Sequence, residues 1–199
     1  MLRTFLCTHN YKLATTFVAT AGTRLTSKNF LSTSLPHNET VYNVLNRVKL
    51  FAQREGRQPR VMVSRIDKNG LNVNPMGHAI RFADLGFDVD VCPDHLSAEE
   101  TAQQSVNADV HVVVACNLAT EYLVIIPALR KELNRLGRSD ILVIANGMIP
   151  NEDHDALYEA GISAIFCHES DIPNCALQAL DELESMLPKD DDDSTACPV

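Results

Sequence analysis

The strongest constraint on the fold is a regular alternation of short apolar runs with longer amphipathic segments. The short runs are rich in β-branched residues and lie at 61–64, 87–91, 110–115, 141–145 and 163–166. The segments with helical periodicity lie at 76–85, from 97 onward, and at 121–136, 151–160 and 173–187. The run at 110–115 is almost continuously apolar, as expected of a strand that is covered on both faces. Five strand–helix units with short connections predict an α/β domain with a parallel sheet between two helical layers.

Two of the expected helices carry recognisable start signals. The first is entered through Asn74 and Pro75, a capping residue followed by the residue type favoured at the first helical position. The second starts at Ser97, and Glu100 three residues later completes a capping box. These signals predict helix starts at both points.

The topology also predicts where a ligand would bind. In open parallel sheets, ligands lie beyond the carboxyl ends of the strands, where the strand order switches. The loops at this edge are 65–74, 92–95, 116–120, 146–150 and 167–173. This rule predicts a location for the site and leaves its chemistry open.

The first 38 residues differ in composition from the rest of the chain. They contain four basic residues (Arg3, Lys12, Arg24 and Lys28) and no acid, because the first acidic residue is Glu39. They are also rich in Ser and Thr and interleave apolar side chains. This composition predicts a mitochondrial transit peptide over 1–38 and a matrix location. A secretory signal fits less well because polar residues interrupt the apolar run, and a disordered terminus is the remaining alternative.

Net charge and hydropathy exclude two classes of function. The formal net charge is −9, which argues against a general nucleic-acid binder. No apolar run reaches the roughly 18 residues of a membrane-spanning helix. The four consecutive aspartates at 190–193 predict that residues 189–199 form an acidic, disordered tail without a site.

The six cysteines favour a reducing compartment, since they form no CxxC pair and no zinc-finger spacing. Cys92, Cys116, Cys167 and His168 all follow predicted strands, so a Cys/His metal or redox site is one alternative. Its spacing matches no known ligand motif, and no metal ligand or catalytic residue is predicted. Among the other histidines, His111 is expected in the core, and surface positions are expected for His78, His95 and His154.

Several motifs resemble a known family. They are Phe-Ala-Asp-Leu-Gly-Phe-Asp-Val-Asp-Val at 82–91, Ala-Asp-Val-His-Val-Val at 108–113, Leu-Arg-Lys-Glu-Leu at 129–133, Leu-Gly-Arg at 136–138 and Asp-Ile-Leu-Val at 140–143. Together with Pro127 they closely resemble the C-terminal cobalamin-binding domain of methylmalonyl-CoA mutase. The resemblance begins at the Arg-Glu-Gly-Arg-Gln-Pro-Arg stretch of 54–60 and runs to about 187. It implies a flavodoxin-like (Rossmann-like) three-layer sandwich with strand order 2-1-3-4-5, a linker helix within 39–59 and a cobalamin-binding-like domain over 60–188.

The first cofactor loop departs from the family pattern. The family carries Asp-x-His-x-x-Gly there, with a histidine that coordinates cobalt and an aspartate that holds the other ring nitrogen. In register, Asn69 replaces the aspartate, Leu71 replaces the histidine and Asn74 replaces the glycine. Leucine has no lone pair to ligate a metal, so histidine ligation of cobalt is lost. The cap at Asn74 and Pro75 suggests that the helix after this loop forms without a cofactor to order it.

Three further loops depart as well. The family's Ser/Thr-Leu loop corresponds to 116–121, which begins at Cys116 and keeps Leu118 and Ala119 but loses the serine. The Gly-Gly pair is Asn146-Gly147, and the Gly-Pro-Gly-Thr loop is 167–170, Cys-His-Glu-Ser. Glycines at such positions let the backbone approach the cofactor's nucleotide tail, and side chains would fill that space. The resemblance places the degenerate crevice at Asn69, Gly70, Leu71, Asn74, Cys116, Leu118, Asn146, Gly147, His168 and Ser170.

These departures favour a non-catalytic mitochondrial protein, a structural or regulatory interaction module with no cofactor and with a mutase or a larger assembly as protein partner. The chain is too short to encode the barrel domain of a self-contained mutase, which takes about 250 residues. The alternative is a cobalamin-binding small subunit without a histidine ligand, working with a separate mutase barrel chain; the retained Gly70, Leu118 and Gly147 favour it. A third option is a small-molecule or nucleotide binder that uses the same crevice.

Overall fold

The computed structural model describes residues 39–67, 75–94, 96–167 and 171–188. Its strands are β1 (Arg60–Ser64), β2 (Asp88–Val91), β3 (Val112–Leu118), β4 (Leu142–Gly147) and β5 (Ala164–Phe166). Its helices are α2 (Glu39–Glu55), α3 (Met76–Asp84), α4 (Ala98–Asn107), α5 (Tyr122–Arg135), the 3-10 turn η1 (Asn151–Asp153), α6 (His154–Glu159) and α7 (Ile172–Met186). The strands pair in parallel in the order β2-β1-β3-β4-β5. The predicted flavodoxin-like fold and strand order are therefore confirmed.

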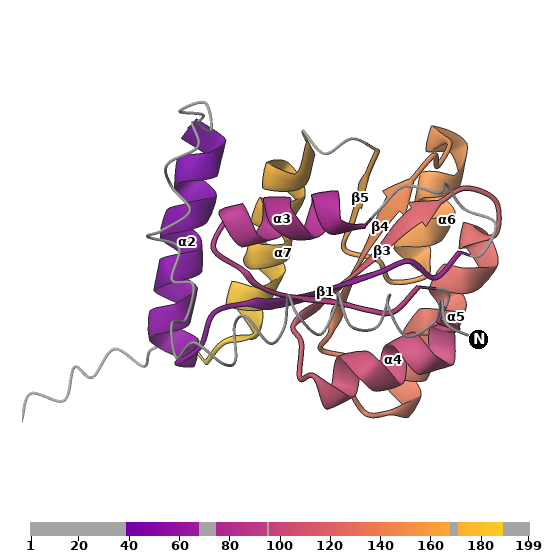
Figure 1. The fold of residues 1–199 in the computed structure, drawn as a ribbon, viewed down its shortest axis with the longest axis horizontal. Coiled ribbons are helices and arrows are strands. Elements are labelled where there is room, and N and C mark those ends of the chain that lie inside the picture. The colour runs from indigo at the N-terminus through magenta and orange to yellow at the C-terminus, as the bar shows by residue number, and fades with distance from the viewer. Residues whose placement is uncertain (1–38, 68–74, 95, 168–170, 189–199) are drawn as a thin grey trace, which may run out of the picture. The chain divides into compact units, whose positions relative to one another are not determined.

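Helices cover both faces of the sheet, as Figure 1 shows, with α2, α3 and α7 on one face and α4, α5 and α6 on the other. Alternate side chains of each strand enter the two layers. In β1, Val63 joins the cluster on the α2, α3 and α7 side, whereas Met62 joins the other cluster. This period of two is what a parallel strand between two helical layers requires. All seven residues of β3 are buried, which explains the nearly continuous apolar run in the sequence.

Helix α2 is packed into the first of these two cores. It buries Val44, Val48 and Phe51 there. It ends at Glu55, directly before Gly56, whose φ of +83° is in the left-handed region that favours glycine. The predicted linker segment therefore contains a helix that contributes core side chains to the domain.

The predicted helix starts are close to those observed. The capping box at Ser97 is present, with the Glu100 backbone N–H donating to Ser97 Oγ at 3.2 Å and the Ser97 N–H donating to Glu100 Oε2 at 2.8 Å. Helix α3 begins at Met76, directly after Pro75, whose φ of −65° is already helical. Asn74 lies outside the described residues.

Two predicted boundaries are wrong. The segment 151–160 is not one helix, because the Asp153 N–H bonds the Pro150 carbonyl in a tight turn and α6 begins only at His154. Strand β3 starts two residues later than the apolar run and extends three residues past it. Asp109 and Asn117, with φ of +50° and +62°, interrupt the extended backbone near its two ends.

Candidate functional site

The candidate site is the edge of the sheet where β1, β3, β4 and β5 end. Of the ten predicted crevice residues, the structure describes four, namely Cys116, Leu118, Asn146 and Gly147. All four are buried, and β3 and β4 bring them together at this edge. The other six lie outside the described residues: Asn69, Gly70, Leu71, Asn74, His168 and Ser170.

The side chain of Asn146 joins three strands at this edge. Its Oδ1 accepts a hydrogen bond from the Asn117 backbone N–H of β3 at 3.3 Å, and its Nδ2 donates to the Phe166 carbonyl of β5 at 3.0 Å. The β3–β4 ladder has an irregularity between Ala115 and Leu118, so the Asn117 amide lies where regular pairing is interrupted. Asn146 is only 3% exposed, and its carboxamide therefore uses both polar ends on the chain's own backbone.

Gly147 is fixed by close backbone packing. A Cβ at this position would lie 2.0 Å from the Leu118 carbonyl oxygen, a separation that no real side chain tolerates. The same oxygen accepts a hydrogen bond from the Met148 N–H at 2.9 Å. Glycine is thus required here by the approach of β3 to β4, whether or not a ligand binds.

A buried polar side chain at this edge that the sequence did not single out is Asp67. It is fully buried, and its Oδ2 accepts from the backbone N–H groups of Ala119 at 3.1 Å and of Thr120 at 3.4 Å. This carboxylate connects the segment after β1 to the loop that leads into α5. An acid two to three residues beyond a buried strand was the available signal, but the resemblance directed attention to Asn69 and Leu71 instead.

Two thiols near this edge, Cys92 and Cys116, are not activated. The Cys116 Sγ donates to the Ser64 carbonyl at 3.3 Å, and burial raises its pKa to about 12. Burial also raises the pKa of Cys92 to about 11. A protonated thiol is a poor nucleophile and a poor metal ligand. Within the described ranges, no group of three or more His, Cys, Asp or Glu side chains is arranged to hold a metal ion.

The histidines are distributed differently from the prediction. His78, expected on the surface, is only 5% exposed, because it shares the core face of α3 with Phe82 and its ring packs edge-on against Phe166 at 5.7 Å. His154 is partly buried, with Nε2 3.3 Å from the Ile149 carbonyl oxygen. His95 lies outside the described residues.

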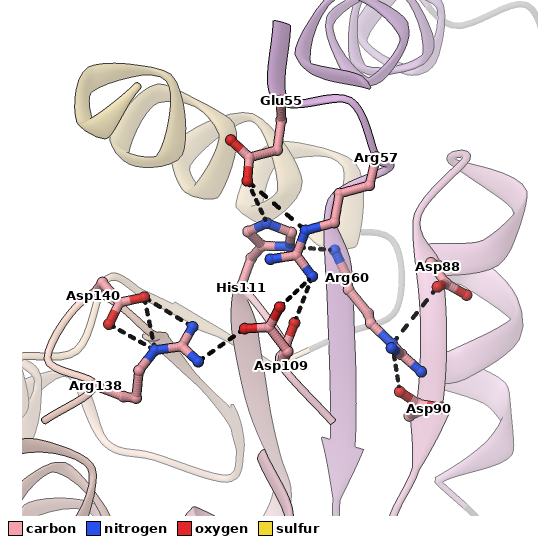
Figure 2. A network of polar contacts seen from close by, with 9 residues as sticks. All are labelled: Glu55, Arg57, Arg60, Asp88, Asp90, Asp109, His111, Arg138 and Asp140. Atoms are coloured by element: carbon pink, nitrogen blue, oxygen red, sulfur yellow. Dashed lines mark hydrogen bonds and ion pairs between the residues drawn. The ribbon is translucent and has the colours of Figure 1, made fainter. Parts of the chain in front are cut away.

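His111, expected in the core, lies at the opposite, amino-terminal edge of the sheet, just before β3, where its side chain is 10% exposed (Figure 2). The ring Nδ1 accepts from the Arg60 backbone N–H at 2.8 Å, and the His111 backbone N–H donates to the Arg60 carbonyl at 2.8 Å. These bonds close the start of β1 onto the residue before β3. Because this edge is opposite the crevice, His111 is not positioned to ligate anything bound there.

Around His111, charged side chains connect the starts of four strands (Figure 2). Asp109 accepts from Arg57 at 2.9 Å and from Arg138 at 2.9 Å. Arg60 in turn donates to Asp90 on β2 at 2.8 Å. The amino edge is thus a network of alternating charges, whereas the carboxyl edge is joined by neutral amides and one buried carboxylate.

Comparison with curated proteins shows extensive similarity to one enzyme family. The chain is 50% identical over 146 residues to the probable mitochondrial methylmalonyl-CoA mutase of Caenorhabditis elegans, covering 73% of this chain and 20% of that protein. It is 43% identical over 152 residues to the mitochondrial methylmalonyl-CoA mutase of Homo sapiens, covering 76% of this chain and 20% of that protein. Against the methylmalonyl-CoA mutase large subunit of Propionibacterium freudenreichii, identity is 44% over 140 residues. The chain thus spans about 20% of the length of these relatives and matches their C-terminal region. No protein-family model matches it.

Solved structures agree on the fold. A cobalamin-binding protein from Desulfitobacterium hafniense superposes with a TM-score of 0.54 over 76% of this chain and 75% of its own, at 12% identity. The monomethylamine corrinoid protein of Methanosarcina barkeri superposes with a TM-score of 0.52 over 70% of this chain and 63% of its own, at 13% identity. At such identities the likeness establishes the shared fold.

Proposed function

Because this chain is a homologue of the C-terminal region of methylmalonyl-CoA mutases, we propose that it is a cobalamin-free form of that region, acting as a non-catalytic interaction module. The observation that carries the proposal is the side chain of Asn146. It occupies a position where the family pattern has glycine. Its amide oxygen accepts from the Asn117 N–H, and its amide nitrogen donates to the Phe166 carbonyl. The space and the hydrogen bonds at this edge are therefore used internally.

The retained glycine does not argue for a bound cofactor. Gly147 is required by the Leu118 carbonyl oxygen, which would lie 2.0 Å from any Cβ. The sequence at the cobalt position supports the same interpretation, because Leu71 stands where the family has its histidine. Loss of the histidine removes the bond to cobalt, and Asn69 lacks the carboxylate that would hold the other ring nitrogen of that histidine.

A non-catalytic role is further supported by the state of the crevice side chains. The carboxylate of Asp67 is committed to two backbone amides, and the thiol of Cys116 is held protonated by burial. A general base or nucleophile needs to be accessible and poised near the operating pH. The Asp67 carboxylate is buried and inaccessible, and burial keeps the Cys116 thiol in its unreactive protonated form.

The partner that we propose is a separate mutase chain. Three large apolar side chains flank the carboxyl edge in exposed positions: Val124 is 72% exposed, Met148 67% and Leu123 44%. Leu123 and Val124 belong to the first turn of α5, and Met148 follows β4 directly. Exposed apolar side chains gathered at one end of a domain are typical of protein interfaces.

Cofactor binding is tested by incubating the full chain with hydroxocobalamin or adenosylcobalamin, desalting it and recording the visible spectrum. We expect no corrinoid absorption to remain with the protein. Stoichiometric retention would instead favour the alternative, a cobalamin-binding small subunit without a histidine ligand.

Partner binding is tested by sedimentation of the full chain mixed with the mutase of the same organism. We expect a complex that Val124→Asp and Met148→Asp weaken at least about tenfold, since each change places a charge in an apolar contact. Tyr158→Asp, at a 46% exposed position on α6, is the matched control and should leave the complex unchanged. A complex insensitive to the first two changes would remove this edge as the interface.

We place the protein in the mitochondrial matrix, supported by the acid-free, basic composition of 1–38 and by the mitochondrial relatives. The proposal treats 1–38 as a transit peptide and 189–199 as an acidic tail outside the domain. Import of the labelled full chain into isolated mitochondria, with protection from external protease and a shortened product, is the expected result. Failure to enter the organelle would contradict it.

A further inference from the structure

We propose that the neutral ring of His111 is a proton-sensitive latch that holds the last turn of α2 against the amino edge of the sheet, and that mild acidification releases it. This inference concerns the edge opposite the crevice and does not depend on the proposed function. It rests on the position of the ring between α2 and the sheet, on its hydrogen bonds and on the charges that surround it (Figure 2).

The ring lies between two parts of the molecule. On one side its Nδ1 accepts from the Arg60 backbone N–H at the start of β1, next to the bond that the His111 backbone N–H donates to the Arg60 carbonyl. On the other side it meets the last turn of α2, where the Phe51 ring packs edge-on at 5.4 Å with an interplanar angle of 90°. Phe51 is itself only 1% exposed, so the contact belongs to the core that α2 shares with the sheet. Movement of the imidazole therefore disturbs the packing of α2 against the sheet.

The hydrogen bond from Arg60 determines the protonation state. Nδ1 accepts the Arg60 N–H at 2.8 Å, so in the neutral ring the proton resides on Nε2. A second proton can bind only at Nδ1, and it would then face the Arg60 N–H donor head-on. The imidazolium form cannot keep this geometry. Protonation thus breaks one of the two bonds that hold the start of β1 against the residue before β3, and the backbone bond from the His111 N–H to the Arg60 carbonyl remains.

Charged groups on every neighbouring element affect the protonation of His111. Glu55 of α2 lies 3.9 Å from Nε2 and favours the imidazolium, as do Asp109 before β3 and Asp140 before β4. Burial disfavours the imidazolium most strongly, followed by the charge of Arg57 in the linker. Arg138 before β4 also disfavours the imidazolium. Burial and the arginines prevail, and the pKa of His111 is lowered from its ordinary value of 6.5. Nε2 is buried without a hydrogen-bond partner, so Glu55 does not compensate fully.

The direction of the pH effect follows from this shift. A histidine whose pKa is lower in the folded state than in the unfolded state binds its proton preferentially when the structure opens. The stabilisation is therefore complete above about pH 6.5 and is lost as the pH falls towards the folded pKa. Opening of α2 should become more frequent over that interval.

The test is hydrogen exchange of the full chain at about pH 7.5 and about pH 5.5, corrected for intrinsic rates, with α5 as the internal reference. We expect α2 to lose protection severalfold relative to α5, with about tenfold as the upper limit, because pH 5.5 is one unit below the ordinary histidine pKa of about 6.5. In His111→Asn, whose side-chain oxygen can accept from Arg60 without titrating, α2 protection should not depend on pH. His154→Asn is the matched control and should behave like the unmodified chain. Equal loss of α2 protection in the unmodified chain and in His111→Asn would overturn the proposal, as would no loss in the unmodified chain.

A second arm does not require that variant to fold. Glu55→Gln removes the carboxylate nearest the ring, so the pH at which α2 loses protection should move downwards, together with the titration of His111 followed by NMR. A midpoint that stays in place, or that does not coincide with the His111 titration, would equally overturn the proposal.

Discussion

Asn146 on β4 donates from Nδ2 to the carbonyl oxygen of Phe166 on β5 at 3.0 Å, and this bond closes the carboxyl edge of the sheet with the chain's own polar groups. The opposite end of the same amide accepts from Asn117 on β3. One side chain thus spans three adjacent strands at the point where a flavodoxin-like sheet usually receives its ligand. Asn146 therefore joins three strands at this edge, and the proposed cobalamin-free function rests on this side chain standing where the family pattern has glycine.

Replacing Asn146 should destabilise the fold. Asn146→Ala removes the hydrogen bonds to the Asn117 N–H and to the Phe166 carbonyl, which should lower the free energy of unfolding by about 2–4 kcal/mol. Urea denaturation measures this change. Asn134→Ala, at an exposed position on α5, is the control and should change stability by less than about 0.5 kcal/mol. Equal effects of the two substitutions would show that the amide bonds do not stabilise this edge.

Two glycines should respond differently to alanine. Gly147→Ala would place a Cβ against the Leu118 carbonyl oxygen, and we expect a loss of about 3 kcal/mol or more. Gly137→Ala meets no atom within 4 Å but retains a φ of +75°, so only backbone strain of about 1–2 kcal/mol is expected. Thermal and urea unfolding of both variants check this order. If Gly147→Ala is the milder change, the close packing of β3 on β4 does not explain the glycine.

The pairing of α2 with α7 should contribute a salt-dependent stabilisation. Arg47 donates to Glu184 at 3.0 and 2.8 Å and lies 2.6 Å from Asp181, and the Glu184 carboxylate raises its pKa. Because Arg47 is partly exposed, Arg47→Ala should cost only about 1 kcal/mol, and less at high salt. Arg135→Ala removes an exposed pair with Glu132 within α5 and should be close to neutral. The comparison is made by urea denaturation at low and high ionic strength, and a loss for Arg47→Ala that does not shrink with salt would contradict an electrostatic origin.

Thiol reactivity should separate one cysteine from three others. Cys167 is exposed, whereas Cys92, Cys116 and Cys175 are buried and burial raises the pKa of Cys175 to about 12. Iodoacetamide at mildly alkaline pH should therefore modify Cys167 rapidly, and the buried three only after unfolding, because the thiolate is the reacting form. Peptide mapping with and without denaturant reads this out. Rapid native labelling of Cys116 would show that the crevice is more open than its hydrogen bonds indicate.

The hydrophobic pattern was sufficient to predict how strands and helices follow one another along the chain, because β-branched runs such as 110–115 and caps such as Ser97 are local signals. The pattern could not locate the ends of β3, since the positive φ values at Asp109 and Asn117 are set by contacts distant in the sequence. His78 was misplaced for a related reason. Its polarity favoured the surface, but the face of α3 that it shares with Phe82 is directed to the core.

At the site, the sequence and its family resemblance identified Asn146 as an altered glycine position and Gly147 as a retained one. They did not show why either residue is there. The reach of the Asn146 amide across two neighbouring strands and the approach of the Leu118 oxygen to Gly147 exist only once the sheet is assembled. Asp67 escaped notice because its partners, the amides of Ala119 and Thr120, lie more than fifty residues further along the chain.

The central claim is that the chain's own hydrogen bonds occupy the crevice at the carboxyl edge. It is tested most directly by equilibrium dialysis of hydroxocobalamin against the full chain and against a variant that combines Asn69→Asp, Leu71→His and Asn146→Gly. The variant restores the family's residues at the cobalt ligand, at its supporting carboxylate and at the first glycine. We predict no saturable binding by the unmodified chain and measurable binding by the variant. Saturable, stoichiometric binding by the unmodified chain would contradict the account.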